Sequence, residues 1–480
     1  MTTTLESTQT ARLTALDHAH VWHPFTPMRQ WREQEPIIIE RAEGFILYDT
    51  EGRRYIDAYS SLWCNVHGHG VDAIDNAIKD QLGRVAHATM LGSSTVPAIE
   101  LAERLVRLVN REGATTFLNK VFYSDAGATA TELAFKMAAG FHHHNGRTGR
   151  DTFVGVKGAY HGDTSGAMSV GYDERMHKPF SSMLFRNAWA MAPNVRTVDA
   201  PSEGLGTEWP SWDSARRERV RDLALDDLDR VLDEVGDRAI AVVIEPLMQG
   251  AGGMIEQPEG YLAGLAQRAK ERGLPLIADE VAVGLCRTGS TLACEQEGVE
   301  PDILCLAKGL SGGYLPLAAT MCTDEIAAAF EGEPGEHKTL YHGHTFTGNP
   351  LACAAANASV DLLAEHDVNA NARGLSTLMR TTLRESLADH PHVGDVRLRG
   401  VMGGIELVAG RGPWRSFDPD ARVGAALCAE ARSRGLMIRP LGDVVILNPA
   451  PSMDQETAAE MLRLLAETIH AFDFSPFAAH

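Results

Sequence analysis

A short apolar run, Leu274–Ala278, ends in two adjacent carboxylates, Asp279 and Glu280. The run lacks helical spacing, so it predicts a buried strand of the kind found in parallel sheets, which are covered on both faces. A second apolar run, 303–307, is followed directly by Lys308. In an open α/β sheet, ligands bind beyond the carboxyl ends of the strands. The sequence therefore predicts an acid and a lysine at one ligand-binding edge.

An acid and a lysine at such an edge suit the chemistry of pyridoxal phosphate. The lysine amine can form a carbon–nitrogen double bond with the aldehyde of this cofactor, and the acid can keep its pyridine nitrogen protonated. The simpler interpretation is that Asp279 caps a helix and that Lys308 is a solvated loop residue. Each residue taken alone favours the simpler interpretation, so the rest of the chain has to decide.

The composition limits the classes of partner. The net charge of −20 opposes binding to nucleic acid and to anionic lipid. The seven cysteines are scattered and form no C-x-x-C pair, which favours free thiols in a reducing cytosol. The first twenty residues contain no apolar core of a signal peptide, and no stretch is long and apolar enough to span a bilayer. We therefore expect a cytoplasmic protein.

Strand-like and helical segments alternate between about residues 120 and 320, which predicts a mostly parallel α/β sheet flanked by helices. From about residue 360 the pattern changes to that of a smaller α+β domain. We expect an N-terminal arm and part of the small domain in 1–61, a large domain in 62–360, and the rest of the small domain in 361–480. Within this scheme, residues 1–20 should be loose, and 200–227 should be a surface loop leading into a charged helix.

Four segments that contain histidine or glycine supply further candidate residues. The turn 125–129 follows a strand and opens a helix, where free N–H groups suit a phosphate. In the loop 157–164, Tyr160 could stack on a flat ring or belong to an ordinary turn. His67 and His69 lack further ligands at metal spacing, so we interpret them as packing residues and expect no metal. We place His142–His144 on the surface near a helix end.

The strings Ala278–Val281, Arg287–Gly289 and Lys308-Gly309 resemble the class III aminotransferases, which are fold-type I pyridoxal-phosphate enzymes. The likeness extends from about Trp22 to Pro451. Further strings are similar to the subgroup of this class that acts on 8-amino-7-oxononanoate in biotin biosynthesis. These strings are Trp22–Met28, Tyr160–Thr164, Gln249–Met254, His342–Thr345 and Arg439–Gly442.

The resemblance implies the residues that hold the cofactor. Lys308 would bind it and act as the general base, and Asp279 would pair with the pyridine nitrogen. Tyr160 would stack on the ring. Gly127 and Ala128 would hold the phosphate through their backbone.

The resemblance also implies a substrate pocket and a homodimer. Thr345 would reach the phosphate of the cofactor in the neighbouring subunit. Arg439 would bind the substrate carboxylate, since its planar fork matches that group. Phe25, Trp63 and the loop 313–316, which begins at Gly313, would wall the pocket.

Three positions bear on the amino donor. Many members carry a second tryptophan where this chain has Leu62, a tyrosine where it has Phe25, and a pocket tyrosine in the place of Ile446. The missing groups belong to the pocket for S-adenosylmethionine, and the changes resemble a branch that uses lysine. The resemblance thus implies 8-amino-7-oxononanoate as acceptor, with S-adenosylmethionine or lysine as donor.

Two other functions are open. The chain could act on another ω-amine or an ornithine-like substrate, although the string Trp22–Met28 argues against this. It could also be a non-catalytic protein that keeps the fold. The presence of Lys308 and Asp279 argues against this second alternative.

Overall fold

A seven-stranded sheet forms the centre of the computed structural model, which describes residues 2–195, 209–412 and 414–477. Six of its strands run in one direction, and β12 alone is antiparallel to both of its neighbours. This confirms the mostly parallel α/β sheet. In spatial order the strands are β4 (Leu118–Ser124), β12 (Ala318–Thr323), β11 (Ile303–Leu306), β10 (Leu276–Asp279), β7 (Ala239–Ile244), β5 (Thr152–Val156) and β6 (Ala188–Ala190).

The central strands are buried on both faces, and alternate residues enter two different cores. Ile277, Val243 and Ile303 pack on one face with residues of α6, whereas Ala278 and Val242 pack on the other with residues of α9 and α10. This alternation follows from the two-residue period of a strand. The helices of this part are α4 (Asp72–Leu82), α5 (Val96–Val109), α6 (Gly127–His144), α7 (Ser165–Val170), α8 (Glu174–His177), α9 (Ser214–Val235), α10 (Tyr261–Glu271), α11 (Asp324–Ala328) and α12 (Pro350–Glu365).

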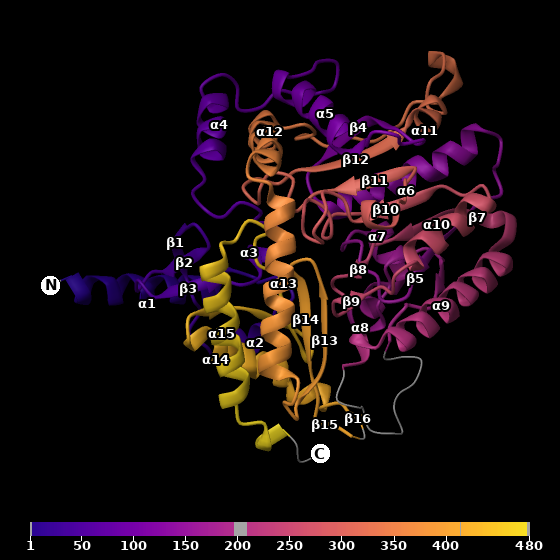
Figure 1. Cartoon of the computed structure of the whole chain (residues 1–480). Helices are drawn as coiled ribbons and strands as arrows, with labels where there is room; N and C mark the ends of the chain where they lie inside the picture. Colours follow the sequence, from indigo (N-terminus) through magenta and orange to yellow (C-terminus); the bar gives the residue numbers. More distant parts are fainter. Residues whose placement is uncertain (1, 196–208, 413, 478–480) are drawn as a thin grey trace.

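A second core lies below the large sheet in Figure 1 and contains the C-terminal helices. One of its sheets has the order β13-β14-β19-β18, and the other joins N-terminal strands to the C-terminal part in the order β1-β2-β3-β17. The elements are β1 (Ile39–Glu43), β2 (Ile46–Asp49), β3 (Arg54–Asp57), α13 (Val368–Leu387), β13 (Val393–Arg399), β14 (Met402–Leu407), α14 (Val423–Ser433), β17 (Leu436–Met437), β18 (Arg439–Leu441), β19 (Val444–Leu447) and α15 (Gln455–Ala471).

Short elements complete the chain. They are α2 (Met28–Trp31), α3 (Ser60–Trp63), β8 (Met248–Gln249), β9 (Ile255–Glu256), β15 (Gly410–Arg411) and β16 (Trp414–Arg415). Of the segment predicted as a surface loop, residues 200–208 lie outside the described part, and the charged helix α9 begins at Ser214.

Two local predictions were wrong. Residues expected to be loose form the helix α1 (Thr2–His20), which extends away from the body of the protein in Figure 1. Its sequence contains neither proline nor glycine, so nothing in it interrupts a helix. His142 was expected on the surface but is buried, and its Nε2 lies 2.8 Å from the carbonyl oxygen of Ile240. Among the described residues, no helix is both long and apolar enough to cross a membrane.

Candidate active site

Asp279 ends β10 as a buried carboxylate with a buried histidine beside it. Its Oδ2 lies 2.7 Å from Nδ1 of His161, and its Oδ1 accepts a hydrogen bond of 3.1 Å from the backbone N–H of Val281. The strands that precede the two residues, β5 and β10, are both neighbours of β7 and run parallel to it. Their following loops therefore meet at one edge of the sheet.

The pKa of His161 reflects two opposing effects. Burial works to lower it, but the hydrogen bond to Asp279 and the charge of that residue outweigh burial and raise the pKa. The remaining ring nitrogen, Nε2, is buried and has no hydrogen-bond partner. His161 lies within the string Tyr160–Thr164, and the sequence predicted no role for it. Its one sequence signal is its position directly after Tyr160.

Lys308 follows β11 and lies within the electrostatic reach of two carboxylates. Burial lowers the pKa of its ammonium group, while the charges of Asp279 and Glu245 partly oppose that effect. The residue keeps some exposure to solvent. Its Nζ lies 5.6 Å from the centroid of the Trp63 ring. A lowered pKa increases the fraction of neutral amine, the form that acts as a nucleophile and base.

Glu245 is a buried carboxylate that directly follows β7. It accepts hydrogen bonds from the backbone N–H groups of Tyr160, at 2.9 Å, and of Gly250, at 3.0 Å. Burial raises its pKa to about 7, since the raising effect of Asp279 joins in and His161 only partly offsets it. Glu245 thus fixes the loop of Tyr160, whose hydroxyl donates to Asp163 Oδ2 at 2.7 Å.

The start of α6 packs tightly between the loops that carry Asp279 and His161. A Cβ atom at Gly127 would lie 2.5 Å from Cγ1 of Val281, and one at Gly162 would lie 2.3 Å from Cβ of Ala128. The first N–H groups of a helix have no intrahelical partner and suit a phosphate. These glycines therefore let the start of α6 lie against the loops that follow Asp279 and His161, and a helix terminus at this edge fits the phosphate of pyridoxal phosphate.

Trp63 lies in a strained segment held by glycines. Trp63 is 8% exposed and has a φ of 63°, and Ser60 and Ser61 also have positive φ values. A Cβ atom at Gly250 would lie 2.9 Å from Cζ3 of Trp63. One at Gly313 would lie 2.8 Å from the carbonyl oxygen of the residue after Trp63. The structure therefore brings together Trp63, Gly313 and Lys308.

The other predicted residues occupy different surroundings. Arg439, on β18, is partly exposed, and its register partner on β19 is Ile446. Phe25 is 60% exposed, and Thr345 is also exposed. Within the described part of a single chain, no recorded contact joins Phe25 or Thr345 to Lys308. Nδ1 of His344 lies 2.9 Å from Oδ2 of Asp125, which places the Thr345 loop near the start of α6.

His67 and His69 have protein partners. His67 Nε2 lies 3.0 Å from the carbonyl oxygen of Ser359, and burial lowers its pKa to about 4. His69 Nε2 lies 3.1 Å from Oδ2 of Asp57. These contacts fit the packing roles expected for both histidines.

The sequence profile of the family Aminotransferase class-III matches residues 28–469. A relative from Nitratidesulfovibrio vulgaris, named adenosylmethionine-8-amino-7-oxononanoate aminotransferase, is 46% identical over 97% of this chain and 84% of its own length. A relative of the same name from Geobacter sulfurreducens is 42% identical over 95% of this chain and 96% of its own length.

Solved structures agree with the sequence match. The structure of the enzyme of that name from Methanocaldococcus jannaschii superimposes with a TM-score of 0.87 at 39% identity, covering 96% of this chain and 99% of its own. An (S)-enantioselective omega-transaminase from Thermomicrobium roseum also has a TM-score of 0.87, at 30% identity, covering 96% and 98%. The chain belongs to the class III aminotransferases, which are enzymes dependent on pyridoxal phosphate.

Proposed function

We propose that this aminotransferase converts 8-amino-7-oxononanoate to 7,8-diaminononanoate in biotin biosynthesis. The observation that carries the proposal is the match of nearly the whole chain, at 42–46% identity, to relatives named for that acceptor. The alternative, another ω-aminotransferase, shares the fold but has lower identity, 30% for the Thermomicrobium roseum enzyme.

The cofactor, when bound, supplies a sink for the electrons that remain on a substrate carbon after its proton leaves. In this proposal Lys308 binds the cofactor and later removes and returns that proton, which its lowered pKa favours. Asp279 pairs with the pyridine nitrogen. Tyr160 covers the ring, and the backbone of Gly127 and Ala128 holds the phosphate.

The substrate would occupy the space between Lys308 and β18, the strand that carries Arg439. Arg439 would bind the single carboxylate of the acceptor, because a guanidinium can form two parallel hydrogen bonds with it. Trp63, Phe25 and the loop that begins at Gly313 would exclude water from the reacting atoms.

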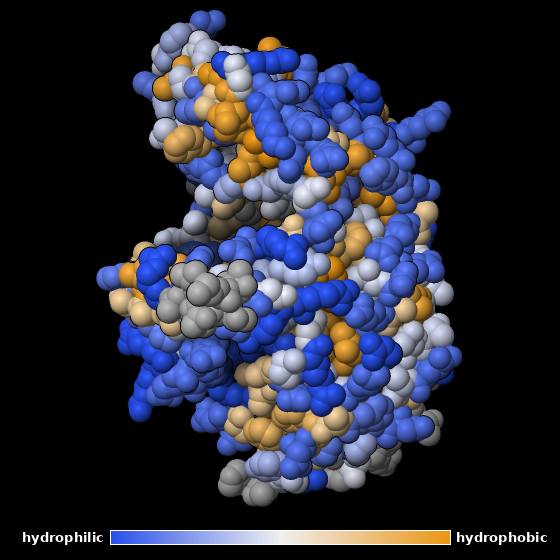
Figure 2. All heavy atoms as spheres, turned by 90° about the vertical axis from the view of Figure 1, so that its left-hand side faces the viewer, coloured by the Kyte–Doolittle hydropathy of each residue, from blue (hydrophilic) through white to orange (hydrophobic). Residues whose placement is uncertain are grey.

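A homodimer would bring in the residues that one chain leaves outside the site. Thr345 and Phe25 are exposed, and large apolar side chains are exposed nearby in sequence to both, including Trp22 and Tyr341. Figure 2 views the face that carries α4 and the N-terminal strands, and apolar atoms lie on both sides of a hollow there. In the proposed dimer, Thr345 reaches the phosphate of the partner's cofactor.

We also infer the domain limits and the compartment. The chain would divide into an arm with part of the small domain (1–61), a large cofactor-binding domain (62–360) and the remaining small domain (361–480). A cytoplasmic location is supported by seven free cysteines, of which six are buried.

S-adenosylmethionine is the proposed amino donor, following the names of the relatives. Lysine is a second candidate because of particular side chains. Leu62 is 49% exposed and offers no aromatic face, and Phe25 lacks a hydroxyl. Both changes weaken the binding of a large cationic donor more than that of a slim one.

Half-reaction assays test the proposal. The purified enzyme should aminate 8-amino-7-oxononanoate with one of the two donors, and Lys308→Ala should abolish turnover. Lys178→Ala provides a matched control, because Lys178 is exposed and pairs with Glu174. If the acceptor is not aminated with either donor but ω-amines are consumed, the chain is another ω-aminotransferase. Full activity in Lys308→Ala would reject the catalytic assignment.

A further inference from the structure

A cavity of about 840 Å³ lies apart from the residues of the candidate active site. One side is formed by the start of α9 and by residues 256–260, and the other by α13 and the end of β13. The cavity therefore lies between α9, which packs on the large sheet, and α13 and β13 of the second core. A ligand of the size of a nucleotide or a tricarboxylate fits such a volume.

The cavity gathers positive charge on a protein with a net charge of −20. Five arginines line it: Arg217, Arg221, Arg380, Arg384 and Arg399. The charge of Arg221 is paired with a neighbouring carboxylate, because its Nε lies 2.8 Å from Asp222 Oδ1. That hydrogen bond, together with the charges of Glu218 and Glu259, raises the pKa of Arg221. Four glutamates also line the cavity, Glu218, Glu256, Glu259 and Glu385, so its described lining has a formal excess of one positive charge.

Glu256 is shared loosely by two of these arginines. Nη2 of Arg217 lies 3.3 Å, and Nη2 of Arg399 lies 3.4 Å, from the same oxygen, Oε1. Well-formed charge-assisted hydrogen bonds are shorter, at about 2.7–2.9 Å. Arg399 also donates to Gln296 Oε1 and to the carbonyl of Gln257, each at 3.4 Å, and its Nε is buried without a partner. Its guanidinium thus keeps unused hydrogen-bonding capacity.

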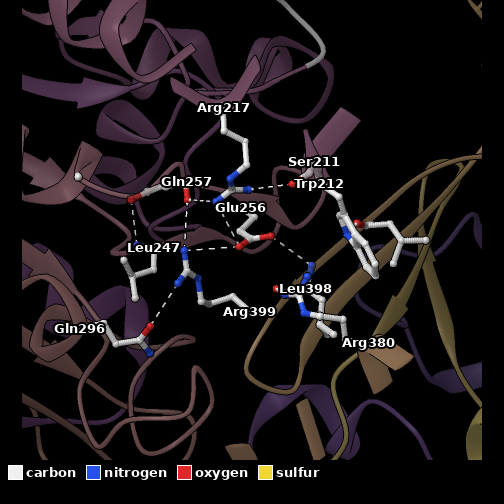
Figure 3. Close-up of polar contacts among 12 residues, drawn as sticks. Ser211, Trp212, Arg217, Leu247, Glu256, Gln257, Gln296, Arg380, Leu398 and Arg399 are labelled. Atoms are coloured by element: carbon white, nitrogen blue, oxygen red, sulfur yellow. Dashed lines mark hydrogen bonds and ion pairs between the residues drawn. The ribbon is translucent and has the colours of Figure 1, made fainter. Parts of the chain in front are cut away.

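Arg380 and Arg384 extend the positive surface over an aromatic ring. Their guanidinium carbons lie 4.9 Å and 5.5 Å from the centroid of Trp212. Arg380 donates to the carbonyl oxygen of Leu398 at 2.9 Å. Neither arginine forms an ion pair within the described part of the chain. Figure 3 shows Arg217, Arg399 and Arg380 arranged around Glu256 and Leu398.

We propose that this cavity binds a small polyanion, bearing phosphates or several carboxylates, between Arg217, Arg380 and Arg399. The guanidiniums converge from α9, α13 and β13, so the ligand would contact both sides of the cavity. An oxyanion would take the hydrogen bonds that Glu256 satisfies only loosely.

Calorimetric titration of the holoenzyme, saturated with pyridoxal phosphate so that its own phosphate site is filled, tests this site. The probes are pyrophosphate, ATP and citrate at low salt. At least one should bind, and Arg380→Gln and Arg399→Gln should each weaken its affinity by about tenfold or more. Arg463→Gln, which removes an exposed arginine paired with Glu467, is the matched control and should bind as the wild type does.

The three probes distinguish the chemical class of the anion. Binding of pyrophosphate and ATP alone assigns a phosphate ligand, and binding of citrate alone assigns a polycarboxylate. Arg380 is exposed, so its variant should keep the melting temperature and turnover of the wild type. Failure of all three probes to bind at millimolar concentration overturns the proposal. A loss of affinity in the Arg463→Gln control equal to that in Arg380→Gln and Arg399→Gln also overturns the proposal.

Discussion

His161 Nδ1 lies 2.7 Å from Asp279 Oδ2, with both side chains buried. The carboxylate therefore has a fixed orientation, and the raised pKa of the imidazole helps to keep a positive charge beside it. A buried carboxylate without such a partner would be costly. His161 acts as a positioning residue for Asp279, because it contacts the carboxylate and holds its orientation.

Replacing His161 should reduce turnover without removing any group that touches the substrate. We expect His161→Leu to lower kcat by about 10–100-fold, because Asp279 loses a charge-assisted hydrogen bond that orients it. His161→Asn keeps one N–H donor and should recover part of the loss. Steady-state kinetics and the pH dependence of the cofactor absorbance measure both effects. His142→Asn, at a buried histidine bound to Ile240, should leave the absorbance profile unchanged.

Glu245 should make the stability of the cofactor-free enzyme depend on pH. Its pKa rises on folding from 4.5 to about 7. The native state therefore binds more protons than the unfolded state in this range, and stability falls as pH rises from 4.5 past 7. The full effect of this group is about 3 kcal/mol. Urea unfolding at about pH 5 and pH 8.5 measures most of this change, because nearly the whole interval between the two pKa values lies between these pH values.

Glu245→Gln isolates that contribution. The variant loses one backbone hydrogen bond at every pH, so the comparison concerns the slope and not the absolute stability. Relative to the wild type, it should become more stable as pH rises. Parallel stability curves for the two proteins would contradict the raised pKa.

The sequence predicted the edge of the sheet that carries Asp279 and Lys308, because short local patterns specify that edge. The apolar runs before Asp279 and Lys308 form neighbouring parallel strands, β10 and β11, so both residues emerge at the same edge. The turn before Gly127 opens α6 as expected. These are short-range signals, since a strand period and a turn occupy fewer than ten residues.

The buried polar partners could not be predicted in the same way. Glu245 and Arg287 act through contacts with segments distant in sequence, such as Glu245 with Tyr160 and Arg287 with Asn448. A single buried charged residue does not recur at a regular spacing, so no periodic pattern in the sequence predicts its burial or its partners. Thr345 shows a different limit, because it is exposed in one chain and its proposed role needs a second copy.

Gly250 should be intolerant of a side chain because of Trp63. An added Cβ would lie 2.9 Å from Cζ3 of the indole, closer than ordinary contact allows. We expect Gly250→Ala to raise the KM for the amino donor by about tenfold and to destabilise the fold by about 1–3 kcal/mol. Gly149→Ala is the control, since an added Cβ there meets nothing within 4 Å. Similar kinetics in the two variants would show that Trp63 does not border the donor.

Arg287 should hold the strained segment that carries Trp63. It is 1% exposed, it forms no ion pair among the described residues, and burial lowers its pKa to about 10. Its Nη1 donates to Ser60 Oγ and to the carbonyl of Pro449, both at 2.8 Å, and its Nη2 donates to the carbonyl of Asn65 at 2.7 Å. This fork joins three segments of the chain.

Lysine cannot reproduce that fork, although it keeps the charge. Arg287→Lys should therefore cost about 2–4 kcal/mol of stability, since buried acceptors lose their donors. Chemical denaturation measures the loss. Arg434→Lys, at an exposed arginine paired with Glu430, should change stability by less than about 0.5 kcal/mol. An equal effect at both positions would argue against a bracing role for Arg287.

Arg439 tests the substrate side of the proposal. The residue lies on β18 opposite Ile446, is partly exposed and forms no ion pair within the described residues, so its guanidinium is available to a carboxylate. Arg439→Ala should raise the KM for 8-amino-7-oxononanoate by about 10²-fold, because a bidentate charged hydrogen bond is lost. The rate of the half-reaction with the donor should change much less. Arg439→Lys should recover only part of the affinity, since an ammonium cannot form the planar pair. Equal losses for acceptor and donor in Arg439→Ala would show that this arginine does not select the acceptor.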